Sequence, residues 1–292
     1  MEYIVHILIL SGIYMILTLS LNLMIGYTGL TALGHIAFAA IGAYTSSLLA
    51  INFGISPWIG LLAGAILASF LGLLVSYPAL RQKGDYLALT TVGLGIIVYS
   101  VLKNWVALTR GPMGLNGIPP FTFFGYGGSN VFGYLVLVLF FVLLTLIVLR
   151  NITHSPFGRI LKGIREDEIA ASAMGKNVNK HKLIVLVAGA FFAGVAGCLY
   201  AHYITFIDPS SFTMMESITV LLMVVFGGMA SLRGSIIGAA VLVIFPEMLR
   251  FLGMPTSVAA PLRQMIYGLL LVVLMLWRPQ GLMGKFMFKK TL

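Results

Sequence analysis

Few residues of this sequence are of types that could do chemistry, and most of those lie in or beside apolar stretches. Asn22, His35 and Glu216 are polar or ionisable residues of this kind. Such side chains are rare inside membranes and mark candidate functional positions. Together with two tyrosines beside glycine-rich sequence, they form the candidate lining of a polar path through the protein: Asn22, Tyr27, His35, Tyr44 and Glu216.

Two of these candidates also have a simpler structural explanation. Asn22 could hydrogen-bond a neighbouring helix, and Glu216, near the start of an apolar run, could lie at the membrane interface. His35 follows a glycine-rich sequence, residues 26–29, that could break a helix pair inside the membrane. Nonhelical backbone at that depth is tolerated only against protein or a water-filled path, which favours a lining position for His35.

The spacing of the remaining polar residues argues against several kinds of chemistry. His, Cys, Asp and Glu do not occur with metal-ligand spacing, and no nucleophile and base form a catalytic pattern. The sequence lacks a Gly-x-x-x-x-Gly-Lys-Ser/Thr phosphate loop, so this chain is not itself an ATPase. Cys198 is the single cysteine and cannot form an internal disulfide. We therefore expect no catalytic residues, metal or bound cofactor.

The composition predicts that most of the chain lies in a membrane. Hydrophobic residues make up 60% of the sequence and charged residues 9%, whereas soluble domains have about 25% charged residues. Because so few charges cannot cover a water-exposed surface, most of the surface must face lipid or neighbouring subunits. The net charge of +10 is spread over short loops, which argues against a nucleic-acid partner.

Apolar runs of roughly membrane-spanning length define the expected elements. The nine runs are Tyr3–Ile25, Leu30–Ile51, Trp58–Leu80, Tyr86–Leu108, Val131–Leu149, Leu183–Tyr203, Phe212–Met229, Ile236–Leu249 and Leu262–Trp277. The run Ile236–Leu249 is short and contains Pro246, so we expect it to be tilted, broken or re-entrant. The expected fold is an all-α polytopic membrane protein with about nine (eight to ten) transmembrane segments, some broken or re-entrant. These segments form one domain, residues 1–292.

The basic residues predict the orientation, because short loops that carry Lys and Arg stay in the cytoplasm. Seven lie between residues 149 and 183, and others lie in the C-terminal tail and after the third and seventh runs. Alternating crossings put all of them on one side. We therefore expect an outer N-terminus, an inner C-terminus, a cytoplasmic loop at 150–182 and an outer loop at 109–130. The outer loop is rich in Gly and Pro and is either an interfacial connector or a docking or gating segment.

The centre of the cytoplasmic loop predicts a short helix from Arg165 to Met174. Acidic residues occupy its first turns and Gly175 follows its end, which suits helix capping and the helix dipole. A helix this short is marginal by itself in water, so its alanine-rich face suggests that it docks into a partner. The candidate contact residues are Arg165, Glu166, Asp167, Glu168, Ala170, Ala171 and Gly175.

Several segments together resemble permease subunits of ABC importers. Ala170-Ala171, followed after three residues by Gly175, matches the EAA-type coupling loop of that class, with the glutamate displaced by one position to Glu168. The longer sequence of residues 158–178 is similar to branched-chain amino-acid permeases of the LivM type. The same similarity extends from about Leu21 to residue 282 and is carried by further segments: residues 21–29, 33–44, 84–86, 109–114 and 226–239.

The resemblance implies a multi-subunit importer in the cytoplasmic membrane of a bacterium or archaeon. LivM-type chains pair with a LivH-type permease and bind two cytoplasmic ATPase subunits, which hold ATP and Mg²⁺. A periplasmic or lipid-anchored binding protein delivers the substrate, and this chain would bind no cofactor itself. The short helix would pass ATP-driven motion to the flanking crossings, Val131–Leu149 and Leu183–Tyr203.

Two other functions are compatible with the same sequence. The same architecture could import urea, an amide or a sugar, and a secondary transporter or channel would also be polytopic. Adjacent genes for ATPases and for a secreted binding protein would distinguish an ABC importer from a transporter of that second class. An amino-acid substrate does not require buried ion pairs, because helix N-termini and unwound backbone can bind its charged groups.

Overall fold

The computed structural model describes residues 2–79, 86–121, 131–250, 265, 268–269, 272 and 280–284. Within these ranges, six helical segments have the length and hydropathy to cross a membrane: Glu2–Tyr27, Ile36–Phe53, Pro57–Tyr77, Tyr86–Asn104, Val131–His154 and Val178–Ile204. Two shorter apolar helices follow, Met214–Gly227 and Leu232–Phe245. The helical polytopic fold is thus confirmed. The expected ninth run, Leu262–Trp277, lies mainly outside the described residues.

The secondary structure consists of helices and one short β pair. The elements before residue 131 are α1 (Glu2–Asn22), η1 (Leu23–Tyr27), α2 (Ile36–Phe53), α3 (Pro57–Ala79), α4 (Tyr86–Asn104), α5 (Val106–Thr109), η2 (Gly111–Met113) and β1 (Leu115–Asn116). The later elements are α6 (Val131–His154), α7 (Pro156–Glu166), α8 (Glu168–Ala173), α9 (Val178–Ile204), β2 (Phe206–Ile207), η3 (Pro209–Phe212), α10 (Met214–Gly227) and α11 (Leu232–Arg250).

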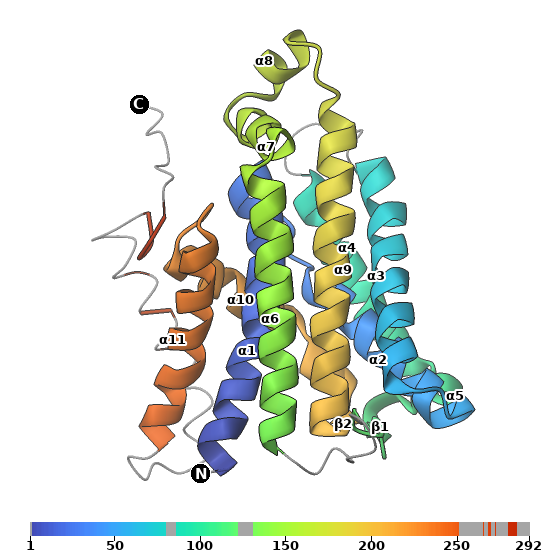
Figure 1. The fold of residues 1–292 in the computed structure, drawn as a ribbon. Coiled ribbons are helices and arrows are strands. Elements are labelled where there is room, and N and C mark those ends of the chain that lie inside the picture. The colour runs from blue at the N-terminus through green and yellow to red at the C-terminus, as the bar shows by residue number, and fades with distance from the viewer. Residues whose placement is uncertain are drawn as a thin grey trace.

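The loops gather at two opposite ends of the helix bundle (Figure 1). The start of α1 lies at one end together with α5, β1 and β2, whereas α7 and α8 lie at the other end. The β pair joins the two loops at the α1 end, with Leu115 opposite Ile207. The segment at 150–182 and the described part of the loop at 109–130 are therefore on opposite sides, as the loop charges require. Which side is cytoplasmic stays a prediction.

The first helix pair is broken, which is one of the alternatives that the glycine-rich sequence allowed. The π-helical turn η1 ends α1, and a nonhelical stretch leads from Gly29 to the start of α2 at Ile36. The side chains of Ser20 and His35 hydrogen-bond at 2.8 Å. After η1 the chain therefore folds back along α1 over a length of roughly 10 Å before α2 begins. The expected helix start at Leu30 was therefore wrong, because residues 29–35 form this re-entrant turn.

The run that contains Pro246 is not broken. α11 is a continuous helix from Leu232 to Arg250, which begins earlier than expected because the Ser231 hydroxyl accepts the backbone N–H of Gly234 at 3.1 Å. The preceding run forms one short helix, α10, which has only 14 residues and follows directly after η3.

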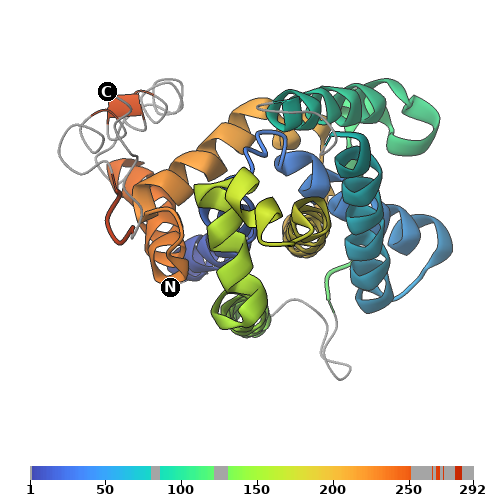
Figure 2. The ribbon, with the colours of Figure 1, turned by 90° about the horizontal axis from the view of Figure 1, so that it is seen from above.

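Small residues let α2, α3 and α9 pack closely against one another. A Cβ atom built on Gly42 would lie 2.3 Å from the carbonyl oxygen of Gly194, and one built on Gly64 would lie 2.7 Å from that of Gly42. Close backbone contact of this kind replaces the hydrophobic effect as the source of helix association in lipid. The glycines therefore bring these helices into backbone contact. In the view along the bundle, α3 and α4 lie on the side opposite α11 (Figure 2).

Replacement of Gly197 by alanine is expected to destabilise the protein by at least about 2–3 kcal/mol, as for overpacking of a filled core. The new Cβ would lie 1.9 Å from the carbonyl oxygen of Ala39, which forces α9 and α2 apart. The matched control is Gly93→Ala in α4, where a Cβ has no neighbour within 4 Å. The measurement is the fraction of detergent-solubilised protein that stays monodisperse after heating. Equal survival of the two variants would contradict this packing.

Candidate functional site

The segment predicted as one short helix consists of two helices separated at Asp167. α7 ends at Glu166, so Arg165 and Glu166 belong to α7 and not to the short helix α8. Asp167 has extended backbone, with φ −157°, and its carboxylate accepts the backbone N–H groups of Ile169 and Ala170 at 2.8 and 3.0 Å. The acidic residue therefore interrupts the expected helix because it caps a new one. Gly175 follows α8 with φ +75°, which agrees with the predicted glycine stop.

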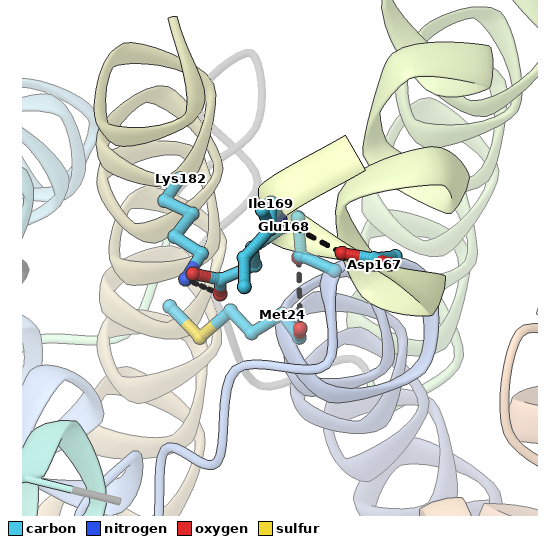
Figure 3. Close-up of polar contacts among 6 residues, drawn as sticks. Met24, Asp167, Glu168, Ile169 and Lys182 are labelled. Atoms are coloured by element: carbon cyan, nitrogen blue, oxygen red, sulfur yellow. Dashed lines mark hydrogen bonds and ion pairs between the residues drawn. The ribbon is translucent and has the colours of Figure 1, made fainter. Parts of the chain in front are cut away.

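An ion pair fixes the start of α8 against α9. The ammonium of Lys182 contacts a carboxylate oxygen of Glu168, and Figure 3 shows the two side chains reaching toward one another from α9 and α8. The Lys182 side chain is only 11% exposed, whereas that of Glu168 is 55% exposed. Lys182 was read from the sequence only as one of several basic residues. Its pairing depends on the tertiary fold, and no sequence pattern indicated it.

One face of α8 packs on the protein and the other is left open. Ala171 is buried in a small cluster with Ile164 and Val178. On the other side, Ile169 is 83% exposed and Met174 is 68% exposed. Ala170 and Gly175 are also exposed. An anchored helix that presents two large apolar side chains beyond the end of the bundle has the form of a docking element.

Arg165 connects α7 to the break after α1. Its guanidinium donates a hydrogen bond to the backbone carbonyl of Gly26, and its side chain packs on Gly29. Burial lowers the pKa of Arg165 from its ordinary value, while the neighbouring Glu166 carboxylate acts in the opposite direction. Since an arginine pKa lies far above neutrality, the side chain stays charged. The segment that carries α8 is thus joined directly to the re-entrant turn.

Asn22 is fully buried and joins the end of α1 to the turn between α10 and α11. Its amide nitrogen donates to the backbone carbonyl of Ser231 at 3.0 Å and to the hydroxyl of Ser235 at 2.6 Å. Its carbonyl oxygen accepts the backbone N–H of Ala230 at 3.0 Å. These bonds agree with the alternative explanation that Asn22 holds a neighbouring helix. A lining role for Asn22 stays a prediction.

His35, Tyr44 and Tyr27 are all buried, but they lie in different places. Nε2 of His35 bonds the Ser20 hydroxyl, while its Nδ1 has no hydrogen-bond partner among the described residues. The Tyr44 hydroxyl is also without a described partner. Its ring packs against Phe212 with 6.2 Å between centroids. Tyr27 lies at the α7 end, where the ammonium of Lys162 is 5.9 Å from its ring centroid.

A cavity of about 270 Å³ lies between α1, α2, α9, η3 and α10. Glu216 and Tyr14 line it, and the Tyr14 hydroxyl donates to the Glu216 carboxylate at 3.0 Å. The rest of the lining combines apolar and hydroxyl side chains, including Leu17, Ile36, Ala39, Tyr200, Ser211 and Phe212. Of the five path candidates, the cavity directly includes Glu216 alone. Tyr44 adjoins it through Phe212. Tyr14 and Tyr200 were not predicted to line the path, because each lies within an apolar run and has an apolar residue on either side.

The described end of the loop at 109–130 is anchored to the bundle. Nδ1 of His202 is 2.6 Å from the carbonyl oxygen of Pro119, and its Nε2 is 2.7 Å from the Ser46 hydroxyl. Phe121 is buried and packs against the His202 ring. In the described ranges, no group of three or more His, Cys, Asp or Glu could hold a metal ion.

The bundle, its apolar outer helix faces and its interior cavity define the chain as a polytopic α-helical membrane protein. Comparison with known sequences identifies the family to which this membrane protein belongs. Residues 3–275 match the model of the family described as branched-chain amino acid transport system / permease component, and the chain belongs to this family.

Three relatives illustrate the place of the chain within the family. The chain is 39% identical to the high-affinity branched-chain amino acid transport permease LivM of Escherichia coli K12, over 96% of this chain and 69% of that protein. It is 27% identical to a probable LivM of Methanocaldococcus jannaschii, over 94% of this chain and 92% of that protein. It is 26% identical to LivH of Salmonella typhimurium, also over 94% and 92%. The expected LivM type is confirmed.

Proposed function

We propose that this protein is a permease subunit of an ATP-driven importer and forms part of the path for branched-chain amino acids. The observation that carries the proposal is α8, an exposed helix anchored at one end of the membrane bundle in a member of the LivM-type family. The chain lies in the cytoplasmic membrane of a bacterium or archaeon, with its N-terminus outside and α8 inside. It has no catalytic role of its own.

The importer contains further subunits, as the family resemblance implies. A LivH-type permease completes the membrane unit, and two cytoplasmic ATPases bind and hydrolyse ATP with Mg²⁺. A periplasmic or lipid-anchored protein delivers the substrate to the opposite end, where the loop at 109–130 lies. On α8 and at its C-cap, the exposed Ile169 and Met174 supply the apolar contact with one ATPase, because burial of exposed apolar surface favours association.

Motion of α8 reaches the membrane helices through two contacts. The first is the Glu168–Lys182 ion pair, which joins α8 to the start of α9. The second is the bond from Arg165 to Gly26, which joins α7 to the re-entrant turn. Asn22 extends this second connection to the α10–α11 turn. ATP-driven displacement of α8 therefore moves the re-entrant turn and the α10–α11 turn.

The cavity beside α10 supplies groups that suit a branched-chain amino acid. The Glu216 carboxylate binds the substrate ammonium, and the N-terminus of α10, which no side chain caps, attracts its carboxylate. Leu17 and Phe212 provide apolar contact for a branched side chain. His35 and Tyr44 stand near the cavity with a buried polar atom that lacks a described partner, and they complete the path.

The test is ATP-dependent uptake into proteoliposomes that contain the complete assembly. Leucine, isoleucine and valine are expected to be accumulated at least about tenfold better than polar amino acids or urea. ATP is required, and omission of the binding protein abolishes uptake. Accumulation of urea, an amide or a sugar in place of leucine would show that the substrate belongs to that other class. Uptake without the ATPases would instead identify a secondary transporter or channel.

A further inference from the structure

A second cavity, of about 460 Å³, lies at the α7 end of the bundle and is separate from the cavity beside α10. It is bordered by η1, α6, α7 and the turn between α10 and α11. The lining residues are Tyr27, Leu146, Arg150, His154, Lys162, Ala230, Ser231, Leu232, Arg233 and Met283. Tyr27, one of the five path candidates, lines this cavity, whereas the exposed residues of α8 do not.

The lining of this cavity has a concentrated positive charge. Arg150, Lys162 and Arg233 converge on it from three separate elements, and His154 adds a fourth basic side chain. No aspartate or glutamate is among the lining residues that the structure describes. The ion pair of Glu168 with Lys182 lies outside this cavity. An anionic occupant would pair with this positive charge, which no described carboxylate of the lining offsets.

The same cavity also has an apolar side. Leu146, Arg150 and His154 lie four residues apart, so they follow one another along one face of α6. Beyond Leu146 toward the other end, α6 exposes large apolar side chains such as Val136, Phe140 and Leu143, which suit lipid contact. The lining therefore combines cations with the apolar side chains of Leu146 and Leu232, and Leu146 lies one helical turn from Arg150 toward the apolar part of α6.

We propose that this cavity binds the phosphate of an anion at the membrane surface. Two sources share that chemistry, an anionic phospholipid headgroup and a free phosphate compound. Arginine pairs with phosphate oxygens through a planar fork, and lysine adds a point charge. The apolar residues beside the cations favour the lipid, since an acyl chain would continue along α6.

An occupant of this cavity would act next to the coupling segment. Lys162 precedes Arg165 by one helical turn on α7, and Arg165 bonds the carbonyl of Gly26. Arg233 belongs to the first turn of α11, directly after the turn that Asn22 holds. A phosphate between Lys162 and Arg233 therefore bridges α7 to α11 and stabilises the arrangement through which α8 is connected to the bundle.

The test compares lipid binding to the purified assembly in detergent with the chain as wild type or as Arg150→Gln/Lys162→Gln/Arg233→Gln. The matched control removes three exposed cations outside the cavity, Arg159→Gln/Lys176→Gln/Lys180→Gln. Dissociation constants for phosphatidylglycerol and phosphatidylcholine come from native mass spectrometry, and inorganic phosphate is assayed by thermal protection. Each cation is expected to contribute about fivefold to the affinity for the anionic lipid. The cavity variant is therefore expected to bind phosphatidylglycerol about 100-fold more weakly, and the control nearly as tightly as wild type.

Binding of phosphatidylglycerol without thermal protection by inorganic phosphate assigns the site to a lipid headgroup. Thermal protection by inorganic phosphate without binding of phosphatidylglycerol assigns it to a soluble phosphate compound. Equal loss in the control variant overturns the proposal, because binding would then follow total charge. Unchanged lipid binding with loss of an ATPase subunit also overturns it, because the cavity would then hold a protein segment. If the triple variant does not fold, Arg150→Gln and Arg233→Gln are tested singly, with about fivefold weakening expected from each.

Discussion

Charge reversal of Glu168 is expected to lower ATP-driven uptake by about tenfold, and simultaneous reversal of Lys182 is expected to restore most of it. Glu168 and Lys182 form an ion pair in which the lysine is largely buried. After allowance for the exposure of Glu168, loss of such a pair costs about 1–2 kcal/mol, close to the value that corresponds to a factor of ten. In E168K, two cations face one another and α8 leaves its position on α9.

The measurement is leucine uptake together with substrate-stimulated ATP hydrolysis in proteoliposomes. E168K is expected to lose the stimulation, whereas basal hydrolysis persists. The matched control is E2K, a reversal of an exposed glutamate at the opposite end of the bundle. E166K serves as a second comparison, since Glu166 lies on α7 and K182E is not expected to rescue it. Failure of E168K/K182E to recover more uptake than E166K/K182E would contradict a coupling role for this pair.

Replacement of Glu216 by glutamine is expected to reduce uptake of branched-chain amino acids by about 30-fold. The variant keeps the size of the side chain but removes the charge that we propose pairs with the substrate ammonium. A charge-assisted hydrogen bond in a partly desolvated site contributes about 2 kcal/mol. Tyr14→Phe, which removes the hydroxyl that donates to Glu216, is expected to cost only a few fold, because the carboxylate remains.

The measurement is the concentration dependence of leucine uptake, with the binding protein saturating. The matched control is Glu247→Gln in α11, whose carboxylate bonds the Tyr3 hydroxyl at 2.5 Å and does not line the cavity. Basal ATP hydrolysis is expected to be unchanged in the Glu216 variant, since the coupling segment is intact. Wild-type uptake by Glu216→Gln would exclude the carboxylate as a substrate ligand, and an equal defect in both variants would indicate a general loss of stability.

The sequence by itself determined the class of fold and the approximate position of the short helix that ends before Gly175. Apolar runs of membrane length and the scarcity of charge predict membrane helices, because the cost of exposing backbone and charge to lipid leaves few alternatives. The break near Gly26 and the stop at Gly175 were also predictable, since glycine tolerates positive φ, and Gly29 and Gly175 adopt it. These features depend on local conformation and hydropathy.

The tertiary structure decided which residues meet. Lys182 looked like one cation among seven between residues 149 and 183 until the fold brought it to Glu168, 14 residues away. Tyr14 and Glu216 are 202 residues apart, and only the packing of α1 on α10 puts both in one cavity. Hydropathy records how apolar each segment is. It does not record which face of a helix turns toward which neighbour, because in lipid that choice depends on the close fit of small residues such as Gly197 against Ala39.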